Sequence, residues 1–433
     1  EKEKEKERKE HKPKHDSLTL TSASTLTPQC IIGSGGFGEV LLVKVDGIPF
    51  PCVLKKMLKI ADEKVVKDCR KEFKVQLKLF NNPKCFNRIP RPLYILDLLD
   101  CDMKGIYGFL MEFCVGGSVS AFSKRWCADG KYESGVDDED SECSSSESAD
   151  DVCASFGPKA MNPVKVCSLC VGMIECLDDV FTAKPKLVHR DVKPDNFLVR
   201  VDPKDGECTV VLADLGFVHI QDSISSSSFS QQIDSSSLTS KTGSKEVGES
   251  QPDDNSNCGT FVFNSYETLT EGIQTQMSDG YSLGLSILSL FTAIPPFLGH
   301  PGLRGIVNPI QFISKLSELL KSGLTPKLTS SPLFKSLVTI EEGDYKPVYE
   351  CLNKVFLGLT EFDAEKRMSV HQARMSVQSI KPLLPKIGEG WKCPSIETIV
   401  SEQLKKHGGS VGTLGHDGVA GVNLKKGWDD SKL

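Results

Sequence analysis

The first part of the chain alternates short apolar runs with glycine-containing turns, a pattern that predicts strands. Over residues 26–60, a Gly-rich turn and an Asp-Gly pair separate the runs, which predicts three strands and their connections. Residues 61–80 carry apolar positions at helical spacing. Two further apolar runs follow at residues 94–96 and 106–113. We therefore expect a small strand-rich lobe over residues 26–115.

Beyond residue 116 the apolar positions follow a helical period instead. Residues 161–182 form one such segment, and residues 278–290 are apolar on nearly every side, which predicts a helix buried in a larger lobe. Weaker amphipathic patterns follow at residues 309–321, 347–359 and 368–383. We expect a larger helical lobe over residues 116–385.

Four segments lack the apolar residues that a packed core needs. Residues 1–25 are charged and polar, residues 129–155 are rich in acids and serine, and residues 221–257 are rich in serine. The tail, residues 386–433, is rich in glycine and lysine and poorly patterned. We expect the first to be a disordered arm and the two serine-rich segments to be inserts in one domain.

Composition and charge narrow the class of protein. The 433 residues carry a net charge of −6, which does not suggest a nucleic-acid binder. No apolar run reaches the roughly 18 residues of a membrane span, so we expect none. The 16 cysteines are scattered rather than regularly spaced. This usage favours a reducing compartment, the cytoplasm or the nucleus.

A Gly-rich turn lies between the first two predicted strands. Its sequence is Gly33-Ser34-Gly35-Gly36-Phe37-Gly38, a G-x-G-x-x-G pattern. Glycines let backbone amides approach phosphate groups closely. In a dinucleotide-binding fold the third glycine would open a helix, and an ordinary hairpin turn is another reading. Here Val40 and further apolar residues follow, so a second strand and a flap over phosphates are favoured.

A polar loop follows the helix predicted at residues 161–182. It reads His189-Arg190-Asp191-Val192-Lys193-Pro194-Asp195-Asn196, with Asn196 five residues after Asp191 and Asp214 23 positions beyond it. A carboxylate and an amide at this spacing suit a loop that accepts a proton and holds a metal ion. Taken alone, the run is equally compatible with a polar turn.

The order of these features resembles the protein kinase family. The Gly-rich turn, Lys55 in an apolar run, the His-Arg-Asp loop and Asp214 in Asp-Leu-Gly occur in the family's order. The resemblance covers residues 26–385 without the inserts. It implies an α+β fold with a small β-rich N-lobe and a larger α-helical C-lobe, ATP between them, and protein substrates.

The resemblance assigns chemistry to four polar residues. Asp191 would be the catalytic base, and Lys193 would neutralise charge on the transferred phosphoryl group, as in serine/threonine kinases. Asn196 and Asp214 would bind Mg²⁺, with Mn²⁺ as a substitute. We expect these four to form the catalytic half of the site.

Lys55 would contact the α- and β-phosphates of ATP. Lys56 is its neighbour, but adjacent strand residues point to opposite faces, so only one of the two can point inward. The next predicted helix would supply the carboxylate partner of Lys55. Glu72 is our choice because Asn82-Pro83 ends that helix at the distance from Glu72 that the family shows, and Glu63 is the rival.

The other nucleotide contacts that the resemblance implies are mostly apolar or backbone contacts. Met111 would be the gatekeeper, and Glu112 and Cys114 would offer backbone groups to adenine. Residues at these positions would belong to the core under any interpretation, so by themselves they give the resemblance little support. The implied ATP-binding set is Ile32, Gly33, Ser34, Gly35, Gly36, Phe37, Gly38, Val40, Val53, Lys55, Met111, Glu112, Cys114 and Leu198, with Ala213 also at the ring.

Three departures from the family pattern bear on activity. Leu215 replaces the phenylalanine of Asp-Phe-Gly, Tyr266 replaces the proline of Ala-Pro-Glu, and Gln76 lies where an apolar residue is usual. Two structural contacts should survive them. Glu267 should pair with Arg367, and Asp279 should hold the His-Arg-Asp backbone.

The sequence therefore predicts a serine/threonine protein kinase that transfers the γ-phosphoryl group of ATP to protein hydroxyls. A pseudokinase that binds ATP or acts as a scaffold is the alternative, and a small-molecule kinase is a third. The run Arg-Asp-Val-Lys-Pro-Asp-Asn-Phe-Leu resembles casein kinase 1-type sequences most.

Two further features carry competing interpretations. One hypothesis is that an upstream kinase phosphorylates the 221–257 insert at Ser225 to Ser228 or Ser235 to Ser237 and that Arg190 receives the phosphate. The alternative is a passive insertion. Cys167 and Cys170 form C-x-x-C, which suggests zinc or redox chemistry. Their helical apolar setting favours buried structural cysteines instead.

Overall fold

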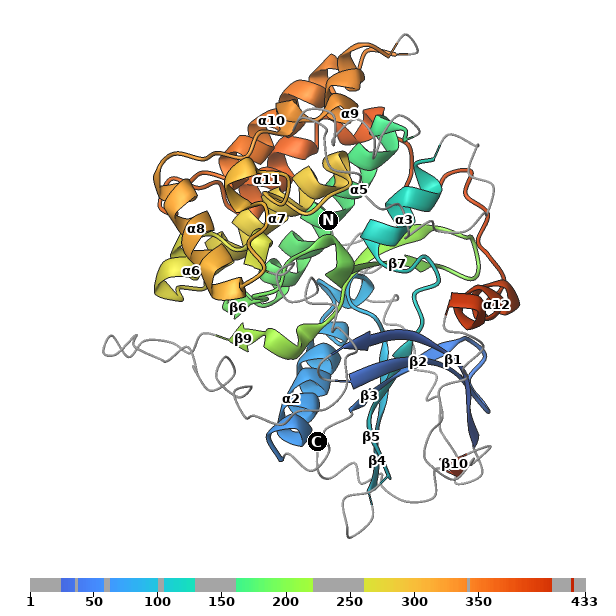
Figure 1. Ribbon diagram of the computed structural model, residues 1–433. Helices are drawn as coiled ribbons and strands as arrows, with labels where there is room; N and C mark the ends of the chain where they lie inside the picture. The colour runs from blue at the N-terminus through green and yellow to red at the C-terminus, as the bar shows by residue number, and fades with distance from the viewer. Residues whose placement is uncertain are drawn as a thin grey trace, which may run out of the picture. The chain divides into compact units, whose positions relative to one another are not determined.

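The computed structural model describes residues 25–35, 38–57, 63–99, 105–128, 161–220, 261–340, 343–406 and 422–423 (Figure 1). The chain divides into two compact units. The described residues of the strand-rich unit come from residues up to Lys74, from Arg91–Phe113 and from Pro394 onward. The described residues of the helical unit come from Val75–Pro90 and Cys114–Cys393.

An antiparallel sheet dominates the strand-rich unit (Figure 1). Its strand order is β10-β1-β2-β3-β5-β4. The strands are β1 (Thr25–Gly35), β2 (Gly38–Val45), β3 (Cys52–Met57), β4 (Pro92–Leu99), β5 (Gly105–Glu112) and β10 (Val422–Asn423). The first five lie where the apolar runs predict strands.

The two faces of this sheet carry different side chains because strand residues alternate in direction. Leu41 and Leu54 lie opposite each other in the β2–β3 ladder, and both pack in one apolar cluster. Leu42 and Val53 are the next opposed pair, and they belong to a second cluster. Val40 lies opposite Lys55 and shares the face of that second cluster.

Helix α2 (Glu63–Phe80) crosses from one unit to the other along the chain. In the strand-rich unit it packs through Phe73, whose ring centroid lies 5.7 Å from that of Phe109 on β5. Arg70 donates from Nε to the Tyr107 hydroxyl at 2.7 Å. These contacts fix the rotation of α2, and therefore the direction of its polar side chains.

The helical unit is built around two apolar helices, α5 (Pro163–Ala183) and α7 (Gln276–Thr292). Asn162 caps α5 and a Thr275–Ser278 capping box starts α7, which satisfies amides that the helix itself leaves open. A Cβ at Gly284 of α7 would lie 2.6 Å from Thr360, so glycine permits close packing there. The other helices are α3 (Val119–Trp126), α6 (Tyr266–Glu271), α8 (Pro309–Lys321), α9 (Pro332–Lys335), α10 (Lys346–Leu359) and α11 (Val370–Val377).

Two short ladders lie in the helical unit: β6 (Leu187–Val188) pairs with β9 (His219–Ile220), and β7 (Phe197–Val201) pairs with β8 (Cys208–Leu212). The polar loop of residues 189–196 runs from β6 to β7. The segment 213–218 runs from β8 to β9. The paired strands therefore bring the two segments together.

Helix α12 (Ile396–Lys406) is one of the elements that the sequence pattern did not predict. It belongs to the strand-rich unit, although it lies near the C-terminal end of the chain (Figure 1). The helix is short, and only four of its positions are apolar, which explains why the pattern was weak. Among the described helices, none combines the length and the apolarity that crossing a membrane would require.

Candidate active site

Lys55 and Glu72 form a close ion pair within the strand-rich unit. The Lys55 Nζ lies 2.7 Å from Glu72 Oε1 and 3.0 Å from Oε2. The lysine side chain is 19% exposed and the glutamate 7%. The pairing expected between β3 and α2 is present, and it uses Glu72 rather than the rival Glu63. Lys56 points to the other face, where its Nζ lies 3.7 Å from Glu39.

The described residues of the Gly-rich turn lie at the end of β1 and at the start of β2. A Cβ at Gly38 would lie 2.3 Å from the Lys56 carbonyl oxygen, so this position needs glycine for the β2–β3 approach. Gly33 faces Val40 and Ser34 is exposed. Gly36 and Phe37 lie outside the described residues.

The predicted base-contacting residues divide between the two units. Ile32, Val40, Val53 and Met111 lie in the strand-rich unit, on the sheet face that carries Lys55. In the hinge segment, the Glu112 amide donates to the Arg91 carbonyl at 2.9 Å, and the Phe113 amide donates to the Pro51 carbonyl at 3.0 Å. The remaining predicted contacts, Cys114, Leu198 and Ala213, belong to the helical unit.

Asp279 holds the backbone of the His-Arg-Asp segment, as expected. Its Oδ2 accepts from the His189 amide at 2.6 Å and its Oδ1 accepts from the Arg190 amide at 2.9 Å. Burial raises the pKa of the Asp279 carboxyl, although nearby His189 and these amides oppose the rise. Arg190 has φ 73°, in the left-handed region, so the two bonds hold a turn that a non-glycine residue rarely adopts.

The Asp191 carboxylate is positioned by two neighbours in the same loop. Asn196 Nδ2 donates to Asp191 Oδ2 at 2.8 Å and also to the Asp191 carbonyl at 2.8 Å. Lys193 Nζ lies 2.9 Å from Asp191 Oδ2. The three residues that the sequence singled out therefore form one connected group, in which Asp191 is buried and Lys193 only partly so.

The β7–β8 ladder brings Asn196 and Asp214 to the same end of the hairpin. Phe197 lies opposite Leu212, and the Ala213 amide donates to the Asn196 carbonyl at 2.8 Å. Asp214 follows directly, in the left-handed region at φ 54°. Next to it, Leu215 is buried in the core of the helical unit, where an apolar residue fills the site usual for phenylalanine.

Asn196 and Asp214 suit a magnesium ion better than a zinc ion. Both offer oxygen, and Mg²⁺ typically takes one or two carboxylates and completes its shell with phosphate oxygens and water. Because the Asn196 Nδ2 is used toward Asp191, its amide oxygen is the atom left to face a cation. Within the described ranges, no group of three or more His, Cys, Asp or Glu residues suits a metal ion.

Glu267 and Arg367 form a second ion pair, inside the helical unit. Arg367 Nη1 lies 2.6 Å from Glu267 Oε1, and Nη2 lies 3.2 Å from Oε2. Burial works to raise the pKa of Glu267, but its bonds and charge interaction with Arg367 outweigh this and hold the pKa below its usual value. Tyr266, in the usual proline position, contacts Phe362 with ring centroids 4.9 Å apart and the rings tilted by 38°.

A comparison with protein families decides the identity of the fold. A model of the protein kinase domain matches residues 27–377, which is most of the chain. The chain belongs to the protein kinase domain family. The strand-rich and helical units confirm the expected bilobal α+β kinase fold. A search of curated proteins found no match to the chain.

Gln76, the third departure from the kinase pattern, has a structural partner. It is 4% exposed, and its Nε2 donates to the Pro90 carbonyl at 2.9 Å. Polar groups in such a position are tolerated when they are hydrogen-bonded. Gln76 therefore ties α2 to the chain that follows it, and does not by itself indicate a loss of kinase function.

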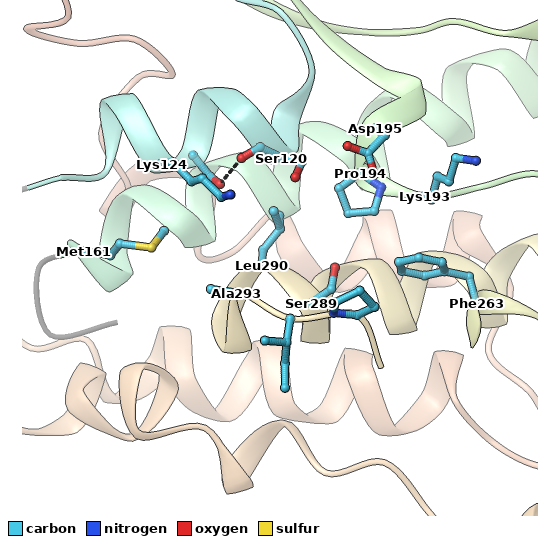
Figure 2. Close-up of a pocket in the computed structure, with 13 residues that line it drawn as sticks. Ser120, Lys124, Met161, Lys193, Pro194, Asp195, Phe263, Ser289, Leu290 and Ala293 are labelled. Atoms are coloured by element: carbon cyan, nitrogen blue, oxygen red, sulfur yellow. Dashed lines mark hydrogen bonds between the residues drawn. The ribbon is translucent and has the colours of Figure 1, made fainter. Parts of the chain in front are cut away.

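A pocket of about 340 Å³ adjoins the Lys193 end of the catalytic loop (Figure 2). Figure 2 shows Pro194 above Ser289 of α7, with Lys193 extending away to one side and Ser120 and Lys124 of α3 on the other. Leu290, Ile294 and Phe263 supply its apolar lining. The pocket lies wholly within the helical unit, and Lys193 connects it to Asp191.

The kinase fold buries the C-x-x-C cysteines. Cys167 and Cys170 are fully buried on α5, one turn apart. Burial, together with mutual repulsion from neighbouring cysteines, raises the pKa of both thiols well above the usual value. The interpretation as structural cysteines is confirmed, because protonated buried thiols are poor metal ligands and nucleophiles.

Sequence reasoning missed the pocket residues on α3 and α7. Ser120, Lys124 and Ser289 carry no motif, and they meet only because α3 and α7 pack beside the catalytic loop (Figure 2). The amphipathic pattern of α3 identifies an exposed face but not what it borders. The serine-rich inserts at 129–155 and 221–257 lie outside the described residues.

Proposed function

We propose that the protein is a serine/threonine protein kinase that transfers the γ-phosphoryl group of ATP to protein hydroxyls. The observation that carries the proposal is the connected group of Asp191, Lys193 and Asn196, with 2.8–2.9 Å contacts to one carboxylate oxygen. A positioned carboxylate with a cation at its side suits a reaction in which a hydroxyl loses a proton as phosphoryl charge develops.

In this proposal each group has a defined task. Asp191 orients the acceptor hydroxyl and takes its proton while the new oxygen–phosphorus bond forms and the bond to the ADP leaving oxygen breaks. Lys193 stabilises charge on the transferred group. Lys55, held by Glu72 at 2.7 Å, would contact the nucleotide phosphates. Mg²⁺, or Mn²⁺ in its place, would neutralise phosphate charge from Asn196 and Asp214.

The serine/threonine assignment and a kinship with casein kinase 1-type sequences rest on the catalytic loop. Lysine at position 193 is the family's mark of serine/threonine specificity, and the run from Arg190 to Leu198 is similar to the casein kinase 1 type. The adjoining 340 Å³ pocket is apolar on the side of Leu290 and Phe263, which suits a side chain of a peptide substrate.

We further propose that an upstream kinase, or the protein itself, phosphorylates the serine-rich insert and that Arg190 receives the phosphate. The Arg190 Nε is buried and has no hydrogen-bond partner among the described residues. Burial lowers the pKa of this guanidinium, which a bound phosphate would reverse. Alanine at Ser225–Ser228 and Ser235–Ser237 should lower activity, and unchanged activity would refute this regulation.

For location, we propose the cytoplasm or the nucleus. The described cysteines, among them Cys167, Cys170 and Cys176, form no disulfides in the structure, and free cysteines are usual in a reducing compartment, which supports this assignment. Fluorescence microscopy of the tagged full chain in cells would test it. Entry into the secretory pathway would contradict it.

The test of the main proposal is transfer of label from γ-labelled ATP in the presence of Mg²⁺. Wild type should label serine or threonine in itself or in a mixed peptide substrate, and Asp191→Asn should lower the rate by about 10²–10⁴-fold. Glu271→Gln, a change at an exposed acid on α6 of the same unit, is the matched control and should act like wild type.

The alternative is a pseudokinase that binds ATP without useful turnover. Leu215 and Tyr266 support this alternative, since both replace residues of the kinase pattern. A thermal shift with ATP and no transfer of label would favour it. Label on tyrosine alone would instead overturn the serine/threonine assignment while leaving the kinase proposal in place.

A further inference from the structure

Helix α12 lies outside the stretch that matches the kinase domain, yet it is a well-formed part of the strand-rich unit. The Ser395 hydroxyl caps its first turn by accepting from the Thr398 amide at 3.2 Å. Ile396, Ile399, Val400 and Leu404 recur at helical spacing, and Ile399 is only 7% exposed. Glu397, Ser401 and Glu402 are exposed on the other side. The helix thus has one apolar face to bury.

That face packs on the small apolar cluster of the sheet. Ile396, Val400 and Leu404 lie against Cys30, Leu42 and Val53, which are 1–4% exposed. Figure 1 shows α12, drawn in red, beside β1. Ile396, Val400 and Leu404 are partly buried by this packing, so the contact removes apolar surface of both the helix and the sheet from water.

The covered cluster shares its sheet face with the Lys55–Glu72 ion pair. Val53 is two residues before Lys55 on β3, and Val40 lies opposite Lys55 on β2. Residues two apart on a strand point to the same face, about 6–7 Å from each other. A ligand whose phosphates reach Lys55 along this face would extend its remaining part toward Val53, and thus toward α12.

The part of the face nearest Lys55 is not closed by the helix. Ile32, Val40 and Met111 pack against the same cluster but stay only partly buried, and Lys55 keeps its 2.7 Å contact with Glu72 while α12 is in place. A helix that blocked the site would be expected to cover these residues as well. The geometry fits a helix that borders this part of the face and does not block it.

We propose that α12 is a wall of the nucleotide site and helps to hold the base of ATP. This inference rests on the proposed function and extends it. The apolar side of α12 supports Val53 and Leu42, and its edge borders the position of the base. Affinity for the nucleoside part of ATP then depends on residues that lie beyond the kinase-domain match.

The experiment compares two neighbouring substitutions in the full chain. Val400→Glu places a charge on the packing face of α12, whereas Ser401→Glu places the same charge on its exposed face and is the matched control. Binding of ATP, of adenosine and of inorganic tripolyphosphate is measured by calorimetry, with KM for ATP and kcat from transfer assays.

Val400→Glu should weaken binding of ATP and adenosine by the same factor, about tenfold or more, and leave tripolyphosphate binding and kcat unchanged. Ser401→Glu should match wild type. If both variants bind adenosine like wild type, the helix is a structural cover and the inference is wrong. Tighter binding or higher activity in Val400→Glu would show that α12 blocks the site instead.

A second variant covers the case in which Val400→Glu does not fold. Leu404→Ala removes apolar contact without adding charge and should show the same pattern with a smaller loss, about two- to fivefold. Failure of the proposed function has a separate signature. If wild type itself binds neither ATP nor adenosine, both proposals fall, whereas normal wild-type binding with indifferent variants overturns the wall alone.

Discussion

Two of the ion pairs between a glutamate and a basic residue lie in different surroundings. Lys55 and Glu72 lie on one face of the sheet, and the lysine side chain keeps 19% of its surface exposed. Glu267 and Arg367 lie inside the helical unit, where the arginine side chain has no exposed surface. Arg367 also donates to the carbonyls of Glu361, Met277 and Phe362, at 2.8–3.2 Å.

Because of this difference, the Lys55–Glu72 pair can accept a further partner, whereas the Glu267–Arg367 pair cannot. A lysine ammonium is a mobile point charge, so Lys55 can keep Glu72 and still turn toward a phosphate. The guanidinium of Arg367 is a planar donor whose protons are committed to one carboxylate and three carbonyls. In the proposed function, the same chemistry of opposite charges serves nucleotide binding in one unit, whereas it holds the architecture of the other.

Loss of Arg367 should give the largest effect, and it should be an effect on stability. Arg367→Ala leaves the Glu267 carboxylate buried without its partner, which should cost about 3–5 kcal/mol of unfolding free energy. Urea denaturation followed by circular dichroism measures this. The control is Lys366→Ala, at the neighbouring position whose side chain is 76% exposed, which should stay within about 0.5 kcal/mol of wild type.

Loss of Lys55 should have an effect almost as large, but on catalysis rather than on stability. Lys55→Met should lower kcat/KM by about 10²–10³-fold through lost phosphate stabilisation, with little change in the urea midpoint. Lys56→Met is the matched control, because that side chain points to the other face near Glu39. Equal losses in the two variants would contradict the assignment of Lys55 and remove the contrast between the pairs.

A substitution at Gln76 tests whether this residue only stabilises the fold or also positions Glu72 for its pairing with Lys55. Gln76→Leu leaves the Pro90 carbonyl without its donor and should cost about 1–3 kcal/mol of unfolding free energy. KM for ATP should not change, because Glu72 stays in place. Lys74→Leu, at an exposed position on the same helix, is the control. A large rise in KM would show that Gln76 also positions Glu72.

The smallest expected effect is on the free energy of unfolding at low pH. The pKa of Glu267 is lower in the folded protein than in the unfolded chain, so its contribution to stability is present above the unfolded pKa, about 4.3, and is lost as pH falls through the folded value. Glu267→Gln should therefore flatten the fall in the free energy of unfolding below pH 5. A profile identical to that of wild type would refute this prediction.

The resemblance to the kinase family supplied both ion pairs, whereas apolar periodicity predicted β1–β5 and most of the longer helices. Glu72 was chosen because its distance from the helix end is the one that the family shows, and Arg367 by its place in the kinase pattern. Residues that act through one loop, such as Asp191 and Asn196, lie close together in the chain, so their spacing already limits their geometry. The same is true of the hairpin that joins Asn196 to Asp214.

The pocket and α12 could not be predicted, for the opposite reason. Ser120 and Ser289 meet only through the packing of α3 and α7, which no local pattern encodes. The partners of α12 on the sheet, Cys30, Leu42 and Val53, are hundreds of residues away in the chain. A short amphipathic segment shows that it needs an apolar surface, but its sequence does not say which one.

The buried cysteines of α5 can report how often the helical unit opens. Cys167 and Cys170 are fully buried, and their thiols stay protonated at neutral pH because burial raises the pKa of each. An alkylating reagent can modify them only after this part of the helical unit has opened. The rate at which mass is added to the peptide that contains both residues would therefore report how often the kinase core opens, without any introduced label.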